Sequence, residues 1–193
     1  MVKINAISQK SSSSYVYDVF ISFRGADTRY SFTDHLHNAL VDASIDTFLD
    51  DAEIQSGEEL KPELESAIKA SRASVIVLSK DYASSTWCLD ELVLILEQHR
   101  NYNHIVIPIF YHVEPTDVRK QQNRFGNSMA KHKQRMETES NAEKKSQWAQ
   151  KIGQWEKALT EVADLKGKDA QGRWRISSLV LSKIEDGMIK VAA

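Results

Sequence analysis

The sequence predicts an α/β protein built on an open parallel sheet with helices on both faces. Short apolar segments rich in β-branched and aromatic residues recur along the chain, at residues 17–23, 45–49, 73–79 and 105–113. Between them lie segments with helical spacing of apolar residues, long enough to act as crossovers between parallel strands. The third segment, ASVIVLS, is almost continuously apolar, as expected for a central strand that is covered on both sides.

The N-terminal half alternates strand and helix signals. Residues 1–14 are polar and lack a hydrophobic period, so we expect a flexible leader there and a single folded domain over residues 15–193. The first strand ends at a turn, RGAD, and an amphipathic helix follows up to Ala43. After the second strand comes a polar loop, residues 50–59, and then a helix with Pro62 in its first turn, where proline is tolerated.

The C-terminal half has a less regular pattern. After the strand at residues 105–113 we expect irregular helical pieces over residues 116–151 and an amphipathic helix over residues 155–165. A short fifth edge strand at residues 174–176 and a last helix at residues 179–191 would complete the fold. Ligands of such sheets bind at the carboxyl ends of the strands, so the loops that follow the strands are where function is expected.

Composition limits the classes of protein that fit. The chain has 193 residues, of which 41% are hydrophobic and 27% charged, as is usual for one globular domain. The single cysteine, Cys88, cannot form an internal disulfide, which favours a reducing compartment such as the cytoplasm. The apolar run at residues 105–111 is interrupted by Pro108 and is far shorter than the roughly 20 residues needed to cross a bilayer, so no membrane association is predicted.

The charges are unevenly distributed. The net charge of −2 argues against nucleic-acid binding, which depends on clustered positive charge. Residues 42–65 are mostly acidic, and basic residues predominate over residues 119–151. Two solvated faces would account for this pattern. Alternatively, the acidic loop of one molecule contacts the basic face of another.

Several familiar catalytic motifs are missing from the sequence. It has neither a glycine-rich dinucleotide fingerprint nor a phosphate-binding loop that ends in Gly-Lys-Ser/Thr. No two histidines are three or four residues apart, so we expect no metal site. Cys88 could act as a nucleophile, but no partner histidine can be assigned, and lone cysteines are most often small core residues.

Residues 84–95, SSTWCLDELVLI, form a predicted helix with two adjacent carboxylates. At about 100° per residue, one helix face should lie on the sheet. That face consists of Leu89, Leu92, Val93 and Leu96. Asp90 falls on a polar flank as an ordinary solvated charge, whereas Glu91 points nearly opposite the sheet, within a second apolar patch beside Trp87. Helical geometry alone favours a surface glutamate at the rim of that patch over a catalytic one.

Four motifs then point to one family. They are YDVFISFRGADTR at residues 17–29, the loop at residues 50–57, STWCLDEL at residues 85–92 and VIPIFY at residues 106–111. In sequence and in order they resemble the TIR (Toll/interleukin-1 receptor/resistance) domains of plant immune receptors, over about residues 15–191. The resemblance implies a flavodoxin-like sheet of five parallel strands, which supports the fifth strand.

The resemblance also implies an activity. Plant TIR domains of this type are NAD+ glycohydrolases of the ADP-ribosyl cyclase type, and their ADP-ribose products, including cyclic ones, signal cell death and defence. NAD+ is then the substrate, no cofactor is required, and the family's catalytic glutamate matches Glu91. One carboxylate is chemically sufficient, because nicotinamide is already a cationic leaving group and the enzyme has chiefly to stabilise an oxocarbenium-like ribose.

Further site residues follow from the matched motifs. Arg24, Gly25 and Ala26 would line the substrate cleft, with Ser85 and Trp87 beside the glutamate. Each has a plain alternative: the first three as an exposed turn, the serine as a helix cap and the tryptophan as an apolar anchor.

The resemblance also concerns assembly. The loop at residues 50–58 resembles the family's BB loop, which gates the site and contacts a neighbouring protomer, and Ala52 stands where some relatives have a polar substrate contact. Asp34 and His35 match the position at which these domains self-associate, with Asp34 in place of the usual serine. The expected partners are copies of the chain and other TIR proteins, in the cytoplasm and also the nucleus. The alternative is a non-catalytic TIR interaction module, against which the full motif around Glu91 argues.

Overall fold

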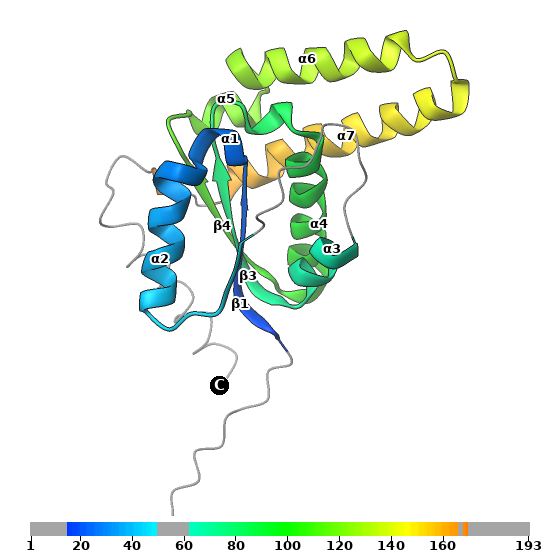
Figure 1. The fold of residues 1–193 in the computed structure, drawn as a ribbon. Coiled ribbons are helices and arrows are strands. Elements are labelled where there is room, and N and C mark those ends of the chain that lie inside the picture. The colour runs from blue at the N-terminus through cyan, green and yellow to red at the C-terminus, as the bar shows by residue number, and fades with distance from the viewer. Residues whose placement is uncertain (1–14, 50–61, 166–167, 170–193) are drawn as a thin grey trace, which may run out of the picture.

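A parallel sheet lies at the centre of the molecule (Figure 1). The computed structural model describes residues 15–49, 62–165 and 168–169. Within them the sheet has five strands in the order β2-β1-β3-β4-β5, and every pair is parallel. The strands are β1 (Tyr17–Phe23), β2 (Thr47–Leu49), β3 (Ser71–Leu78), β4 (Ile105–Phe110) and β5 (Lys168–Asp169). The predicted open parallel sheet is confirmed.

The two central strands, β1 and β3, have both faces covered. Alternate residues point to opposite sides of a strand, so Phe20 and Ile76 belong to one apolar cluster and Val19 and Val75 to the other. Val19 pairs with Ala73 and Phe23 with Val77 along the ladder. This register brings the carboxyl ends of β1 and β3 to the same edge of the sheet.

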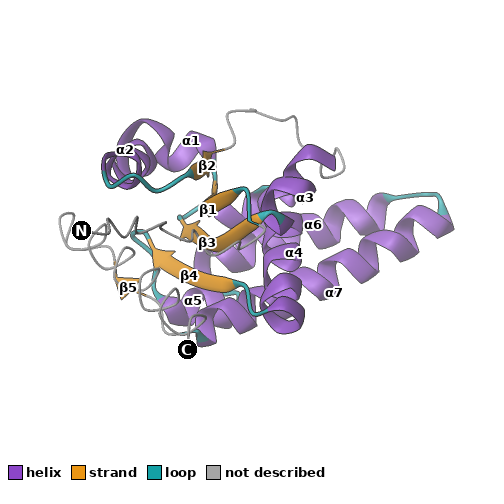
Figure 2. Ribbon diagram, turned by 90° about the horizontal axis from the view of Figure 1, so that it is seen from below, coloured by secondary structure: helices purple, strands orange, loops and turns teal. Residues whose placement is uncertain are grey.

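Helices form a layer on each side of the sheet (Figure 2). On one side lie α1 (Gly25–Thr28), a π-helical turn η1 (Arg29–Thr33) and α2 (Asp34–Asp42). On the other lie α3 (Pro62–Lys69), the 3₁₀ turn η2 (Tyr82–Ser84) and α4 (Thr86–Tyr102). Leu36 and Leu40 bury the inner face of α2 against one side of the sheet, and Leu89 and Leu92 do so for α4 on the other. The predicted helix with Pro62 in its first turn corresponds to α3, which the structure describes from Pro62 onward.

Two long helices occupy the region for which the sequence predicted irregular pieces, and the second of them contains most of the amphipathic helix expected over residues 155–165. After α5 (Pro115–Arg119), α6 (Asn123–Thr138) and α7 (Ala142–Asp164) run antiparallel and project beyond the sheet as a hairpin (Figures 1 and 2). The prediction of irregular pieces was wrong because α6 buries two polar side chains in its stripe. Its buried residues recur at helical spacing and are Phe125, Ser128, Met129 and His132.

The last strand of the sheet that the structure describes lies earlier in the sequence than the predicted fifth strand. The fifth strand lies at Lys168–Asp169, where it pairs with Ile109 and Phe110 of β4. The expected positions of this strand, at residues 174–176, and of the last helix, at residues 179–191, fall outside the described residues. So do the leader, residues 1–14, and the loop at residues 50–58 with Ala52. Of the helices that the structure describes, none has the length and apolar character to cross a membrane.

Candidate active site

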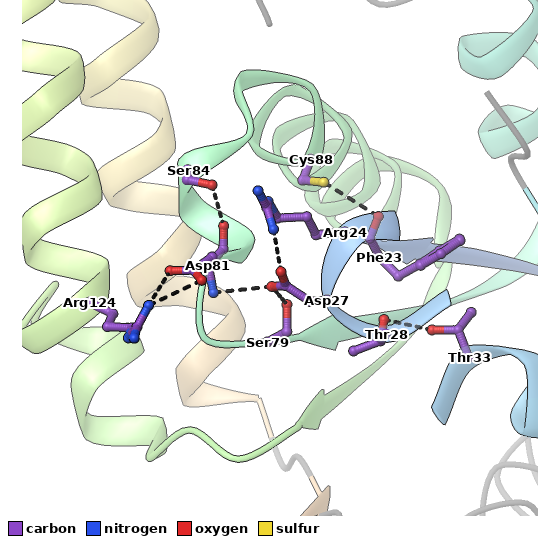
Figure 3. Close-up of polar contacts among 10 residues, drawn as sticks. All are labelled: Phe23, Arg24, Asp27, Thr28, Thr33, Ser79, Asp81, Ser84, Cys88 and Arg124. Atoms are coloured by element: carbon purple, nitrogen blue, oxygen red, sulfur yellow. Dashed lines mark hydrogen bonds and ion pairs between the residues drawn. The ribbon is translucent and has the colours of Figure 1, made fainter. Parts of the chain in front are cut away.

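Asp27 joins the loops that follow β1 and β3. Its Oδ2 accepts hydrogen bonds from Ser79 Oγ at 2.5 Å and from the backbone N–H of Asp81 at 3.2 Å (Figure 3). Its Oδ1 forms an ion pair with Arg24, the first residue after β1. The loops after these two strands therefore lie at the same edge of the sheet, and Asp27 connects them.

The start of α4 places Glu91 against the same edge of the sheet. Ser85 has an extended backbone, and its Oγ accepts a hydrogen bond from Cys88 N at 3.3 Å, which caps the helix. One turn further on, Glu91 is only 3% exposed. Ser22 Oγ of β1 donates a hydrogen bond to Glu91 Oε2 at 2.6 Å.

The predicted orientation of Glu91 is wrong. The sequence placed it opposite the sheet at the rim of an exposed patch, whereas its carboxyl contacts β1 and is buried. The helical angles assumed a single covered face, but α4 is covered by the sheet, by η2 and by α7, so a wider arc of the helix is buried. The buried positions along this arc are Thr86, Cys88, Leu89, Glu91, Leu92, Ile95, Leu96 and Gln98.

Asp90 is not the solvated charge that the sequence predicted. Its carboxylate accepts hydrogen bonds from Trp155 Nε1 at 2.8 Å and from Lys151 Nζ at 2.9 Å, and its side chain is 15% exposed. Both donors lie on α7. Asp90 therefore fastens α7 to α4 on the flank of the helix next to the one that carries Glu91.

Sequence reasoning missed Tyr82, a fully buried residue of η2. Its hydroxyl donates to the carbonyl oxygen of Cys88 at 2.9 Å and lies 3.0 Å from Ser22 Oγ, and so it is one hydroxyl away from Glu91. Burial raises the pKa of Tyr82 well above its usual range, and the nearby Cys88 and Glu91 add to the shift. The available signal was a tyrosine three residues before the helix cap Ser85, but nothing in the sequence says that it reaches back to β1.

Cys88 is a core thiol. Burial raises its pKa, with a further contribution from Glu91, so the thiol stays protonated at neutral pH. Its Sγ lies 3.5 Å from the carbonyl oxygen of Phe23. A nucleophilic role, which the sequence left open, is disfavoured by this environment.

The other predicted site residues are brought together only in part. Arg24 and Glu91 both lie close enough to Cys88 to affect its pKa, so both are near the end of β1. Gly25 is half-buried, and a Cβ there would stand 3.3 Å from the Arg29 guanidinium, while Ala26 is exposed. These positions surround the end of β1.

Trp87, Asp34 and His35 have different surroundings. Trp87 packs against the apolar cluster of α4, and within the described part of the chain its buried Nε1 has no hydrogen-bond partner. Asp34 and His35 begin α2, on the opposite side of the sheet, where Asp34 is half-buried and His35 exposed.

Comparisons with known proteins agree with this architecture. The family model of the TIR domain matches residues 16–192. The chain is 51% identical over 151 residues to disease resistance protein RPV1 of Vitis rotundifolia, and 49% identical over 154 residues to disease resistance protein RUN1 of the same species. These matches cover 78% of this chain in both cases and 10% and 11% of the two relatives, so the chain spans about a tenth of their length.

A solved structure is similar throughout the fold. It is that of the TIR domains of the activated Roq1 resistosome, which directly recognises the pathogen effector XopQ. The TM-score is 0.68 at 41% sequence identity, and the match covers 92% of this chain and 99% of that one. The sheet, its order and the family model agree, and the chain belongs to the TIR domain family.

Proposed function

We propose that this TIR domain cleaves the bond between nicotinamide and ribose in NAD+, with Glu91 as the catalytic residue. The observation that carries the proposal is the position of Glu91. A buried carboxyl lies at the carboxyl edge of a parallel sheet, and a serine of the central strand β1 holds it there. It stands within STWCLDEL, the motif on which the resemblance to the NAD+-cleaving TIR domains rests.

The reaction requires little from the protein beyond a well-placed negative charge. The C1′–N bond breaks, its electron pair leaves with nicotinamide, and positive charge develops on the ribose. A carboxylate at this point stabilises that charge, and its low-dielectric surroundings strengthen the interaction. Water then gives ADP-ribose, and attack from within the ADP-ribose moiety gives a cyclic product. NAD+ is the substrate, and no cofactor takes part.

Substrate contacts would come from the end of β1 and the start of α4. Arg24 carries a positive charge beside the site and suits the pyrophosphate or ribose oxygens, once it leaves Asp27. Gly25 and Ala26 offer backbone close to the same point, and Trp87 offers an aromatic face. For Ser85, the observed helix cap supports a positioning role for α4 as much as a direct contact.

The burial of Glu91 supports control of access. A side chain that is 3% exposed cannot meet a ribose until its covering groups move. We attribute this opening to assembly through the surface of α2 that carries Asp34 and His35. The partners are copies of this chain and other TIR proteins. The similarity to TIR domains of an activated resistosome supports assembly as the trigger.

A role in plant immune signalling, in the cytoplasm and nucleus, completes the proposal. It rests on relatives whose names describe disease resistance.

The test is incubation of concentrated protein with NAD+, followed by chromatography of the products. We expect nicotinamide together with ADP-ribose or a cyclic ADP-ribose, at a rate that grows faster than the protein concentration. If a protein that demonstrably self-associates releases no nicotinamide, the non-catalytic interaction module is the correct function.

A further inference from the structure

A continuous chain of polar contacts leads from Glu91 back to the backbone of its own helix. Glu91 Oε2 is 2.6 Å from Ser22 Oγ, Ser22 Oγ is 3.0 Å from Tyr82 Oη, and Tyr82 Oη is 2.9 Å from the carbonyl oxygen of Cys88. The side chains come from α4, β1 and η2. Ser22 is 1% exposed and Tyr82 0%, so these contacts are shielded from bulk solvent.

The chain has one contact more than it has hydroxyl protons. Ser22 and Tyr82 supply one proton each, and the Cys88 carbonyl can only accept. When Glu91 is ionised, Ser22 donates to it. Tyr82 can then donate its proton to the carbonyl or to Ser22 Oγ, but not to both. When Oε2 of Glu91 carries a proton, all three contacts are filled in one direction, from Glu91 through Ser22 and Tyr82 to the carbonyl. The count concerns Oε2, the oxygen that Ser22 contacts.

We propose that Ser22 and Tyr82 are positioning residues that let Glu91 accept and return a proton during NAD+ hydrolysis, an inference that rests on the proposed function. As the water oxygen bonds to C1′ and nicotinamide leaves, one water O–H bond breaks and its proton passes to Oε2 of Glu91. Ser22 then turns its proton to Tyr82, and the third contact is filled. Loss of the proton to solvent restores the ionised state, so that NAD+ and water give nicotinamide, ADP-ribose and one proton.

Of the residues in this series of contacts, Glu91 is the one that changes charge, because the neighbouring titratable groups keep theirs. Burial raises the pKa of both Tyr82 and Cys88, so both keep their protons at neutral pH. Arg24 and Asp27 also act on Cys88, and they form an ion pair with each other, so their charges largely cancel.

Removing either hydroxyl should shift the pH profile of kcat, and the two single substitutions should shift it in opposite directions. In Tyr82→Phe, Ser22 loses the acceptor to which it donates when Glu91 is protonated and keeps only an ionised Glu91 as acceptor, which favours the ionised carboxyl. In Ser22→Ala, Glu91 loses this donor, which favours the protonated carboxyl. We expect the acid limb of the kcat profile to move by about 0.5–1 pH unit, to lower pH in Tyr82→Phe and to higher pH in Ser22→Ala.

Matched controls separate this effect from simple loss of stability. Ser74→Ala removes a buried serine that contacts His104 on the same sheet, and Tyr17→Phe removes a hydroxyl at the far end of β1. Neither should move the acid limb. Shifts of equal sign in Ser22→Ala and Tyr82→Phe, or no shift in either, would overturn the proposal. If Ser22→Ala does not fold, Tyr82→Phe alone decides, because only a shift to lower pH agrees.

A second readout does not depend on activity. With ¹³C-labelled glutamate carboxyls, the signal of Glu91 can be assigned by its loss in Glu91→Gln and followed against pH. Its titration midpoint should fall in Tyr82→Phe and rise in Ser22→Ala. If the wild-type protein releases no nicotinamide, the proposed function fails, and the midpoints still test whether Ser22 and Tyr82 control the protonation of Glu91. Unchanged midpoints in an active enzyme would reject the positioning role of Ser22 and Tyr82 and leave the proposed function intact.

Discussion

Asp90 and Glu91 leave α4 in different directions and contact different parts of the fold. Asp90 receives hydrogen bonds from Trp155 and Lys151 on α7, while Glu91 receives one from Ser22 on β1. A turn of about 100° between neighbours on a helix is enough to separate a structural carboxylate from the proposed catalytic one. Residue type and position in the chain alone do not distinguish the two.

At the same scale, the motif, and not helical geometry, led to the proposal of Glu91 as the catalytic residue. The donor Ser22 lies 69 residues away in sequence, and Tyr82 reaches it only because η2 folds back over the end of β1. Contacts of this kind depend on tertiary packing, which hydrophobic period does not encode. The cap at Ser85 is local, and its residue type could be recognised in advance.

His104 should make stability depend on pH. It is 4% exposed, its Nε2 lies 2.7 Å from Ser74 Oγ, and burial lowers its pKa to about 4. The unfolded chain binds this proton near pH 6.5, so stability is full above that pH and declines as the pH falls towards 4. We expect a loss of roughly 3 kcal/mol from this group, measured by urea denaturation.

The control for this prediction is His104→Gln, which keeps a side chain able to bond Ser74 and removes the titration. Its free energy of unfolding should vary less between pH 6.5 and pH 4 than that of the wild type. His132, whose pKa is also lowered, chiefly by burial, accounts for part of the remaining slope. An unchanged slope in His104→Gln would show that the assignment is wrong.

At the scale of elements, the strands and the helix starts could be predicted because their signals are local. The apolar run of β3 and the proline at the start of α3 each determine structure within a few residues. The hairpin of α6 and α7 could be predicted only in its last part, residues 155–165, because much of the remaining surface is polar and only an inner stripe is buried. The two-residue β5 is too short for a sequence pattern to locate.

The contact between α4 and α7 should depend on Asp90. Asp90→Ala leaves the Trp155 N–H and the Lys151 ammonium without their acceptor, and we expect a loss of about 2–3 kcal/mol in the free energy of unfolding. Glu97→Ala, an exposed carboxylate on the same helix, should cost less than about 0.5 kcal/mol. Equal stabilities of the two variants would contradict the role given to Asp90.

At the scale of the whole molecule, four cations of the basic segment, residues 119–151, form ion pairs within the same molecule. These cations contact acidic residues of other elements, at 2.7–3.0 Å. These pairs are Arg119–Asp164, Arg124–Asp81, Lys133–Glu156 and Lys151–Asp90. The hypothesis of an acidic loop contacting a basic face of another copy therefore rests on other exposed cations, such as Lys131 and Arg135. Charge reversal at Glu58 and Glu59, outside the described residues, tests it through the salt dependence of self-association.

Assembly through α2 gives a separate prediction. His35 is exposed at the start of that helix, and His35→Ala should shift self-association to about tenfold higher concentration, as a loss of 1.4 kcal/mol would produce. Sedimentation velocity measures the shift, and nicotinamide release should follow it. Lys69→Ala, on α3 across the sheet, is the matched control and should assemble like the wild type. Wild-type assembly of His35→Ala would exclude this surface.

The central claim is that the buried carboxylate of Glu91 carries NAD+ cleavage, and its most direct test is the rate of nicotinamide release by Glu91→Gln beside Glu97→Gln. Glutamine keeps the size of the side chain and an oxygen that can accept from Ser22, while it removes the charge and replaces the other oxygen by an amide nitrogen. At equal assembly, we expect Glu91→Gln to release nicotinamide at least about 100-fold more slowly than the wild type, and Glu97→Gln to match it. Equal release by Glu91→Gln and the wild type would contradict the account.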